Sequence, residues 1–331
     1  MEIRKVQLTG KSTYTVSLPK TWANKVGLRE KAQVSLSLLP DGSIRVAPRE
    51  QTKPQKRKIY KIDTFFGDAL ARQIIAIYIA GYEIIELKAE RITSEQRKII
   101  RDMTYRLIGT EIVEETAKSV VIQDLLNPTE LPVKKALRRI HLIVESMHMD
   151  AIKSLIKDDV DLANDVIQRD GDVDRLYLLI IKRLKKMTES PYIEGSDVSA
   201  EDGLEYYLAA SSLERIADHA HKIAKSALML SGNTIPEELF GDIKVANDMS
   251  NKIVGLAVDA FFKLDIALAE ESIQLKSKQM EILDRLDKSI FRLEAQLAVL
   301  LGTVVDSMDR VGDYGVNIAE VALDLAIAKS L

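Results

Sequence analysis

The sequence predicts a multidomain protein with a small N-terminal β domain, a small α/β module and an all-α C-terminal half of two tandem three-helix bundles. In the first segment, hydrophobic residues alternate as they do in β-strands. In the second, strand-like and helix-like patterns follow each other in turn, and the third shows helical periodicity alone. Polar, proline-containing stretches at 51–57 and 127–132 separate these three segments. The helical segment also repeats itself at an interval close to 110 residues, which indicates two copies of one unit.

Residues 1–50 contain short alternating runs, VQLTG, YTVSL, AQVSLSLL and SIRV, separated by turn residues. Asp41 and Gly42 between the last two runs predict a hairpin turn. Pro19 suits the first turn of a short helix over KTWANKVGL, and Gly27 suits its end. So small a β unit exposes strand edges and has little core, so we expect it to be more stable as an intertwined dimer.

Charge is distributed unevenly along the 331 residues, although the net charge is only −3. Residues 1–61 hold 14 Lys or Arg against 4 Asp or Glu, a net charge of +10, and the remainder has a net charge of −13. This split indicates a basic N-terminal head that binds a polyanion and an acidic body that binds a different kind of partner. A basic surface that is merely solvated is the alternative.

Several classes of protein are excluded or disfavoured by composition. The chain has no Cys, which excludes disulfides, thiolate metal sites and a cysteine nucleophile. The N-terminal MEIRKVQLTG lacks the apolar region of a signal peptide, and the charge-free apolar runs are too short to span a bilayer. We therefore expect a cytoplasmic protein without membrane insertion.

The stretch from Gly10 to Lys31, GKSTYTVSLPKTWANKVGLREK, resembles the AbrB/MazE-like (SpoVT-AbrB) swapped-hairpin DNA-binding domain over about fifty residues. Two chains of that family interleave, and basic residues of the paired hairpins contact DNA. The resemblance thus implies a homodimer with DNA as its partner, in which phosphate contacts supply affinity and not sequence choice. Some members pair with toxins, so a head that only dimerises is the alternative. The DNA-binding residues that the resemblance implies are Arg4, Lys5, Lys11, Ser12, Lys20 and Lys25.

Residues 58–126 alternate between strand-like and helix-like segments and end in a hairpin pattern, TEIVEET followed by KSVVIQDLL. Strands alternating with helices predict a small α/β sandwich. Its glycines are isolated at helix ends or turns, so they do not form a phosphate loop. We interpret the module as a spacer or a dimerisation unit, with an effector pocket as the alternative.

Residues 133–331 are helical and duplicated, with repeat one over about 133–230 and repeat two over about 240–331. The interval is 110 residues for the second helices and 95 for the third, because repeat one carries the longer loop TESPYIEGSDVSAEDG. The matching acidic positions are Asp174 with Asp284, Glu214 with Asp309, and Asp218 with Asp313.

The third helix of each repeat carries an acidic face opposite an apolar stripe. At about 100° per residue, Glu214, Asp218 and His221 share one face of the first copy. The second copy presents an array without a basic partner on its face: Asp306, Asp309, Asp313, Asn317 and Glu320. Like charges four residues apart destabilise a helix, so the array needs a counterion. Carboxylates are hard oxygen ligands, and His221 as an extra ligand would make iron, zinc or manganese suitable; a solvated face is the alternative.

The segments LERIADHAHKIAK at 213–225 and MDRVGDYGVNIAE at 308–320 resemble the twin signatures of PhoU, the phosphate-uptake regulator, over about 133–331. The resemblance implies two tandem three-helix bundles that bind metal clusters through E/D-x-x-x-D motifs. We expect this half to sense phosphate status either directly through its metal clusters or through contact with the ATPase subunit of a phosphate ABC transporter. The chain departs from the pattern at Lys222, Lys225 and Met280, which leaves neither ligand set complete. The implied metal ligands are Asp170, Asp174, Glu214, Asp218, Asp284, Asp309, Asp313 and Asn317.

Another possible metal site is the face formed by His141, Glu145 and His148 on the first helix of repeat one, although a partly exposed structural face is the simpler interpretation. We expect no catalysis, because the sequence offers no phosphate cradle and no nucleophile paired with a base. A metal-dependent phosphatase is the alternative from the enzyme class. The sequence as a whole predicts a phosphate-responsive transcriptional regulator of phosphate transport, or else an adaptor that contacts the transporter and does not bind DNA.

Overall fold

A computed structural model describes residues 2–38, 42–48, 55–126, 130–189 and 197–330. The chain divides into two units, residues 1–55 and residues 56–331, which are described separately below. Asp41 of the predicted turn, most of the predicted linker, Asn127, and residues 190–196 of the loop in repeat one lie outside the described residues. None of the helices in the described part of the chain is both long and apolar enough to cross a membrane.

The N-terminal unit follows the predicted order of two short strands, a helical turn and two further strands. Strands β1 and β2 form one antiparallel hairpin, and β3 and β4 form another, in which Val34 is opposite Pro48. Pro19 precedes the helix and Gly27 follows it with φ +69°, a backbone conformation that glycine adopts without steric cost. The elements are β1 (Gln7–Thr9), β2 (Thr13–Thr15), α1 (Lys20–Lys25), β3 (Val34–Leu38) and β4 (Ile44–Pro48).

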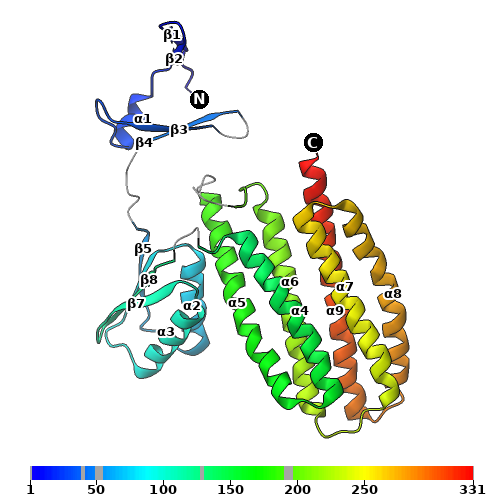
Figure 1. The fold of residues 1–331 in the computed structure, drawn as a ribbon. Coiled ribbons are helices and arrows are strands. Elements are labelled where there is room, and N and C mark those ends of the chain that lie inside the picture. Colours follow the sequence, from blue (N-terminus) through cyan, green and yellow to red (C-terminus); the bar gives the residue numbers. More distant parts are fainter. Residues whose placement is uncertain (1, 39–41, 49–54, 127–129, 190–196, 331) are drawn as a thin grey trace. The chain divides into compact units, whose positions relative to one another are not determined.

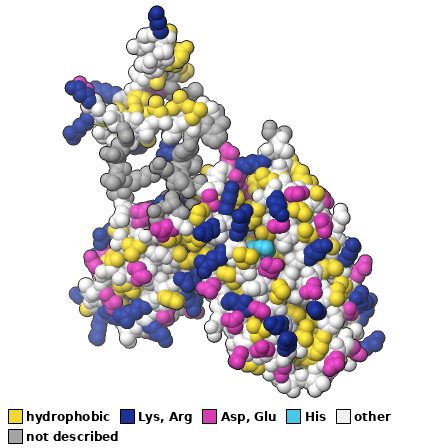
Figure 2. All heavy atoms as spheres, viewed as in Figure 1, with side chains coloured by type: hydrophobic (Ala, Val, Ile, Leu, Met, Phe, Trp, Pro, Cys, Tyr) yellow, Lys and Arg dark blue, Asp and Glu magenta, His cyan; other side chains and the backbone are white. Residues whose placement is uncertain are grey.

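This unit has no core of its own. Among its described residues, 2–38, 42–48 and 55, none is buried. Large apolar side chains lie instead at its surface (Figure 2), among them Tyr14 at 76% and Leu38 at 74% exposure. A β unit without buried side chains gains almost no hydrophobic stabilisation, so the two hairpins require a further surface to pack against.

The second unit begins with the predicted α/β module. Strand β5 pairs in parallel with β6, and β6 and β7 pair with β8 in antiparallel fashion, which gives the order β5-β6-β8-β7. Leu70, Ile74, Leu87 and Ile100 are fully buried and form the centre of its core. The elements are β5 (Arg57–Lys61), α2 (Gly67–Ile79), β6 (Ile84–Lys88), α3 (Ser94–Arg106), β7 (Thr110–Glu115) and β8 (Ser119–Asp124).

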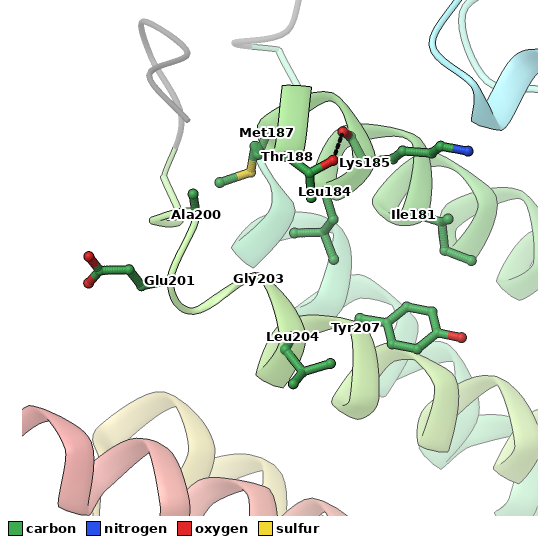
Figure 3. Close-up of a pocket in the computed structure, with 10 residues that line it drawn as sticks. All are labelled: Ile181, Leu184, Lys185, Met187, Thr188, Ala200, Glu201, Gly203, Leu204 and Tyr207. Carbon is green, nitrogen blue, oxygen red and sulfur yellow. Dashed lines mark hydrogen bonds between the residues drawn. The ribbon is translucent and has the colours of Figure 1, made fainter. Parts of the chain in front are cut away.

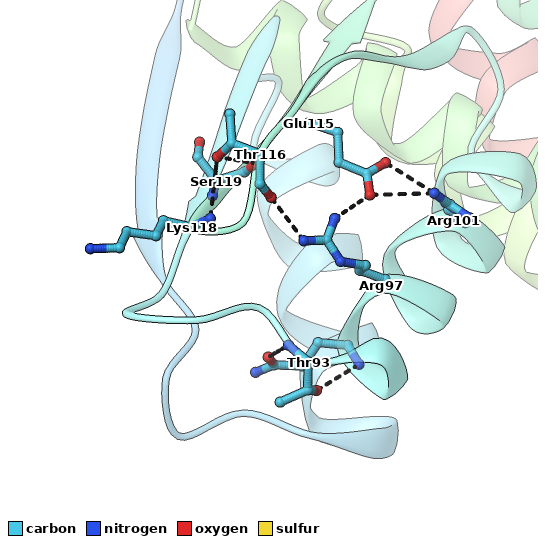
Figure 4. A network of polar contacts seen from close by, with 8 residues as sticks. Thr93, Arg97, Arg101, Glu115, Thr116, Lys118 and Ser119 are labelled. Carbon is cyan, nitrogen blue, oxygen red and sulfur yellow. Dashed lines mark hydrogen bonds and ion pairs between the residues drawn. The ribbon is translucent and has the colours of Figure 1, made fainter.

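Helix α3 is fixed at its start and along its outer side. Thr93 and Gln96 form a capping box, which satisfies backbone N–H groups that have no partner within the helix. Arg97 and Arg101 both bind the carboxylate of Glu115 at the end of β7 (Figure 4). Hydrogen bonds from these two guanidinium groups hold the pKa of Glu115 below its usual value.

The described residues of the helical half form six long helices in two up-and-down groups of three, as the sequence repeat predicts (Figure 1). The first connection of each group is the same tight turn, with Asp158 and Leu264 in the left-handed conformation at φ +54° and +55°. One continuous apolar core runs through both groups. The helices are α4 (Val133–Lys157), α5 (Val160–Glu189), α6 (Gly203–Leu230), α7 (Glu237–Lys263), α8 (Ile266–Ile290) and α9 (Ala295–Lys329).

Helix α5 of the first bundle packs directly on the α/β module. Lys182 is only 6% exposed, and its Nζ lies 2.6 Å from Asp124 Oδ2 and 3.9 Å from the centre of the Tyr78 ring. Leu178, one turn away, packs against the core of the module, and Lys186 binds Glu83 at 2.9 Å. A buried lysine with two partners at this contact fixes the module against the bundle.

Gly315 of α9 lies at a close approach of that helix to α7. A Cβ atom at this position would come within 2.7 Å of Ile253 Cγ2 and 3.3 Å of the Val254 backbone nitrogen. A Cβ atom at Gly302, on the same helix, would meet nothing within 4 Å. The sequence GDYGVN therefore needs its second glycine for helix contact.

We expect Gly315→Ala to lower the free energy of unfolding by about 1–3 kcal/mol, because α7 and α9 must separate to admit the methyl group. Gly302→Ala is the matched control, and it should be neutral or stabilising by about 0.5–1 kcal/mol because alanine favours the helix. Urea denaturation of both variants measures the difference. Equal stability of the two variants would contradict the close approach at Gly315.

Candidate functional site

The acidic residues of repeat one lie together on the outer side of α5 and α6. Burial, followed by the charges of Asp170 and Asp218, raises the pKa of Asp174 to about 6, although this side chain keeps contact with solvent. Burial and the charges of Asp218 and Asp174 raise the pKa of Glu214 to about 7. The four carboxyl groups thus repel one another, and this part of the predicted ligand set is brought together.

The surroundings of these four acids agree with the predicted helix faces. Ile216, Ala220 and Ile223 are buried on the opposite side of α6. His221, considered above as an extra ligand, bonds instead through Nδ1 to Asp170 Oδ2 at 2.9 Å. Burial of His219 lowers the pKa of its imidazole, and the charge of the exposed Lys222 lowers it further.

The acidic residues of repeat two have a basic partner on a neighbouring helix, which the pattern along their own helix did not indicate. Lys276 of α8 places its Nζ 2.6 Å from Asp309 Oδ1 and 2.8 Å from Asp313 Oδ1. The same ammonium group donates to the backbone oxygen of Asp309 at 2.8 Å, and the Lys276 side chain is only 13% exposed. The counterion that this array needs therefore comes from a neighbouring helix.

Other members of the second set are less enclosed. Asp284 and Asn317 are exposed on α8 and α9. The sequence pattern did not single out Asp287. Burial, followed by the charges of the nearby Asp284 and Asp309, raises the pKa of this carboxyl group. Comparison of the two repeats could have pointed to Lys276. The matching position 110 residues earlier is Val166, a buried apolar residue, so the lysine is a departure from the repeat.

The two repeats therefore differ in how well they fit a metal ion. The carboxylates of repeat one lack a Lys or Arg partner within 4 Å among the described residues, and burial and neighbouring carboxylates raise the pKa of Asp174 and of Glu214, so their charge suits a cation. Lys276 already supplies that charge in repeat two. No three His, Asp or Glu side chains in the described part of the chain are arranged to hold a metal ion, so metal binding at repeat one requires side chains to change rotamer.

The face formed by His141, Glu145 and His148 is the partly exposed structural face expected from the sequence at His141 and Glu145, which are half-buried, whereas His148 lies deeper. His148 is fully buried, and its Nδ1 lies 3.2 Å from Asn251 Oδ1 of α7 in the second repeat. Burial lowers the pKa of His148 to about 4 and also lowers the pKa of His141. The neutral His148 imidazole is a structural contact between the two repeats.

The candidate DNA-binding residues all lie at the surface of the N-terminal unit. Arg4 contacts both Glu2 and the Ser17 hydroxyl, the latter at 3.2 Å, so part of its hydrogen-bonding capacity is used within the unit. The remaining five are exposed, and they are Lys5, Lys11, Ser12, Lys20 and Lys25. Exposed ammonium groups on a unit without a core suit a polyanionic surface such as a nucleic-acid backbone.

We expect Glu214→Gln to stabilise the metal-free protein at pH 8 and to have no effect at pH 5. The folded carboxyl group has the raised pKa, so between about pH 5 and 7 it keeps a proton that the unfolded chain has already lost. The free energy of unfolding of the parent protein therefore falls as pH rises through this range. Glu214→Gln has no proton to lose, so at pH 8 it should be more stable than the parent by on the order of 1 kcal/mol. Denaturant unfolding with a chelator measures it, with the exposed Glu270→Gln as control. A gain at both pH values would contradict this account.

We expect Lys276→Gln to destabilise the protein by about 1–3 kcal/mol in a chelator, because Asp309 and Asp313 lose their counterion. Excess Mn²⁺ should restore stability by binding the freed carboxylates. The control is Lys278→Gln, an exposed position on the same helix, which should behave as the parent protein in both conditions. Thermal unfolding with and without Mn²⁺ gives the comparison; a loss that Mn²⁺ leaves unchanged would argue against a cation site held closed by lysine.

Two family models match this chain. The model described as "PhoU domain" matches residues 137–227, and the model described as "Antidote-toxin recognition MazE, bacterial antitoxin" matches residues 7–54. The first covers most of repeat one, including Asp170, Asp174, Glu214 and Asp218. The second covers most of the N-terminal unit. The sequence resemblances stated above are thereby confirmed.

Similar proteins come from several bacteria. "Phosphate-specific transport system accessory protein PhoU homolog 1" of Thermotoga maritima is 25% identical over 212 residues, 59% of this chain and 85% of the relative. A PhoU homolog of Aquifex aeolicus is 28% identical over 140 residues, 42% of this chain and 62% of the relative.

Solved structures share the fold of the helical half. PhoU from Pseudomonas aeruginosa matches with a TM-score of 0.54 at 24% identity, covering 59% of this chain and 96% of the other. PhoU from Streptococcus pneumoniae matches with a TM-score of 0.52 at 19% identity, covering 58% of this chain and 92% of the other. The chain therefore combines a MazE-like N-terminal region, an α/β module and a C-terminal helical region that matches the PhoU domain model over residues 137–227 and shares the fold of solved PhoU structures.

Proposed function

We propose that this protein is a phosphate-responsive transcriptional regulator of phosphate transport, which binds DNA as a homodimer through residues 1–50. The support is the presence in one chain of a basic MazE-like head and a PhoU domain. Proteins similar to the helical half are named as accessory proteins of a phosphate-specific transport system. A head that binds DNA would place this regulatory half at a promoter.

The observation that carries the DNA-binding half of the proposal is the lack of a core in the basic head. Its apolar strand residues, among them Leu36 and Leu38, are exposed and can be buried only against another surface. A second copy of the same two hairpins offers a surface of the same size and pattern. Pairing would also double the number of exposed lysines on one surface, which strengthens attraction to the phosphates of DNA.

The acidic face of repeat one would hold a divalent or trivalent metal ion in this proposal. Asp170 and Asp174 of α5 and Glu214 and Asp218 of α6 offer four carboxylates whose mutual repulsion a metal ion would relieve. Iron, zinc and manganese all accept such ligands, with His221 nearby as a nitrogen donor. The bound ion would supply positive charge for an anion such as phosphate.

A second candidate function is an adaptor that contacts the phosphate transporter and never binds DNA. The names of the relatives favour it, since they are accessory proteins of a transport system. The MazE-like head would then serve only to join two chains. Direct measurement of DNA binding separates the two candidates.

We expect the purified protein to bind DNA from upstream of phosphate-transporter genes with a strong dependence on salt. Replacing Lys5, Lys11 and Lys20 together with Gln should weaken binding and lower the slope of log K against log salt by about 3, since each lost phosphate contact removes about 0.9. Fluorescence anisotropy at several salt concentrations measures both quantities.

The matched control replaces three exposed lysines of the helical half, Lys153, Lys157 and Lys244, so that net charge changes by the same amount. This variant should retain the parent affinity and slope. Equal losses in the two variants would show attraction to bulk charge alone. Absence of DNA binding by the parent protein would favour the adaptor.

A further inference from the structure

A cavity of about 580 Å³ lies where the α/β module faces the acidic residues of repeat one. Helices α2 and α3 form one wall, and α5 and α6 form the other. This volume lies within the range of small-molecule sites, which often occur between packed domains. The Lys182–Asp124 pair and Leu178 hold the two walls together, so the cavity is a fixed feature of the packed unit.

The wall from the α/β module carries two arginines that are not held in close ion pairs. Arg72 of α2 and Arg106 of α3 line the cavity, are exposed, and have no acidic partner within 4 Å among the described residues. A third arginine at the cavity, Arg175, lies 3.7 Å from Asp172 and stacks over Tyr105. Unpaired guanidinium groups are suited to bidentate binding of a phosphate group.

Apolar side chains lie between the two walls. Ile75 and Met103 come from the module, and Leu178 comes from α5. These side chains offer a surface on which the carbon skeleton or base of a ligand can pack. An inorganic ion such as orthophosphate would leave this surface and most of the volume unused.

The opposite wall presents hydrogen-bond acceptors. Asp174 and Glu214 line the cavity from α5 and α6. The charge of Arg106 acts on Asp174 across the cavity and opposes the increase in its pKa. Carboxylates at such a position accept hydrogen bonds from hydroxyl groups, as acidic residues do from ribose in dinucleotide sites. Asp68 and Asp102 also line the cavity, and this further disfavours a ligand that is anionic throughout.

We propose that this cavity binds a small phosphorylated metabolite of about nucleotide size that carries hydroxyl groups. Arg72 and Arg106 bind the phosphate, Ile75 and Met103 contact the organic body, and Glu214 accepts hydrogen bonds from the hydroxyls. The inference names the class of effector for the regulator and to that extent rests on the proposed function. Such a ligand contacts the module and the bundle at once, and thus links the sensing half to the module that directly follows the head in the chain.

A second hollow in the helical half lacks these features (Figure 3). It measures about 390 Å³ and lies between the end of α5 and the start of α6. Leu184, Met187 and Leu204 dominate its lining, and its only charged lining residues among those described are Lys185 and Glu201. Its described lining offers one ammonium group and no guanidinium group for bidentate contact with a phosphate, so the cavity at Arg72 and Arg106 is the one we assign.

The test is isothermal titration of the full-length protein with AMP, ribose 5-phosphate, adenosine and inorganic phosphate. Titrations are run with a chelator and with Mn²⁺, because the same carboxylates are candidate metal ligands. We expect AMP or ribose 5-phosphate to bind at least tenfold more tightly than adenosine or inorganic phosphate. Arg72→Gln and Arg106→Gln should each weaken that binding at least tenfold in both conditions.

The matched control is Arg101→Gln on α3, whose guanidinium binds Glu115 and does not line the cavity. It should leave the affinity unchanged. The inference is overturned if neither phosphorylated compound binds, if adenosine or inorganic phosphate binds equally well, or if Arg101→Gln weakens binding as much as Arg106→Gln. DNA binding by the same preparation is measured in parallel, so loss of one activity with the other intact shows which proposal fails.

Discussion

The buried contact of Lys182 with Asp124 and Tyr78 is the interaction that joins the α/β module to the first bundle. Lys182 is only 6% exposed, so its ammonium group loses hydration and burial lowers its pKa. The Asp124 carboxylate at 2.6 Å and the Tyr78 ring at 3.9 Å compensate this cost of burial. The wall of arginines therefore faces the wall of carboxylates at a fixed spacing. The cavity between these two walls depends on this contact.

The duplicated helical unit shows how one scaffold can balance the same charges in two ways. Repeat two neutralises Asp309 and Asp313 with the ammonium group of Lys276, a permanent internal cation. Repeat one has Val166 at the corresponding position, so no ammonium group there offsets the burial and the neighbouring carboxylates that raise the pKa of Asp174 and of Glu214. A charge-balanced face adds stability, whereas an unbalanced face costs stability until a cation or a ligand arrives. The first repeat is therefore the one suited to respond to a change in its surroundings.

The head and the body obey different constraints. The helical half buries a continuous core that one chain supplies, from Val133 to Leu325. The head, in contrast, presents its apolar strand residues outward, and its order depends on a surface that one copy does not provide. A domain of this kind gains stability when another surface covers its exposed apolar side chains.

The sequence by itself determined the three segments, the order of their elements, the duplication and the acidic faces. Periodicity, turn residues and the spacing of Glu214 and Asp218 are local, and a residue's place on a helix face follows from geometry alone. Only the tertiary structure decided what each face meets. Lys276 reaches Asp309 from a helix 33 residues away, His148 is buried against Asn251 of the other repeat, and Arg106 faces Asp174 across a module boundary. Contacts between distant segments depend on how helices pack, and no local pattern in a single sequence records that.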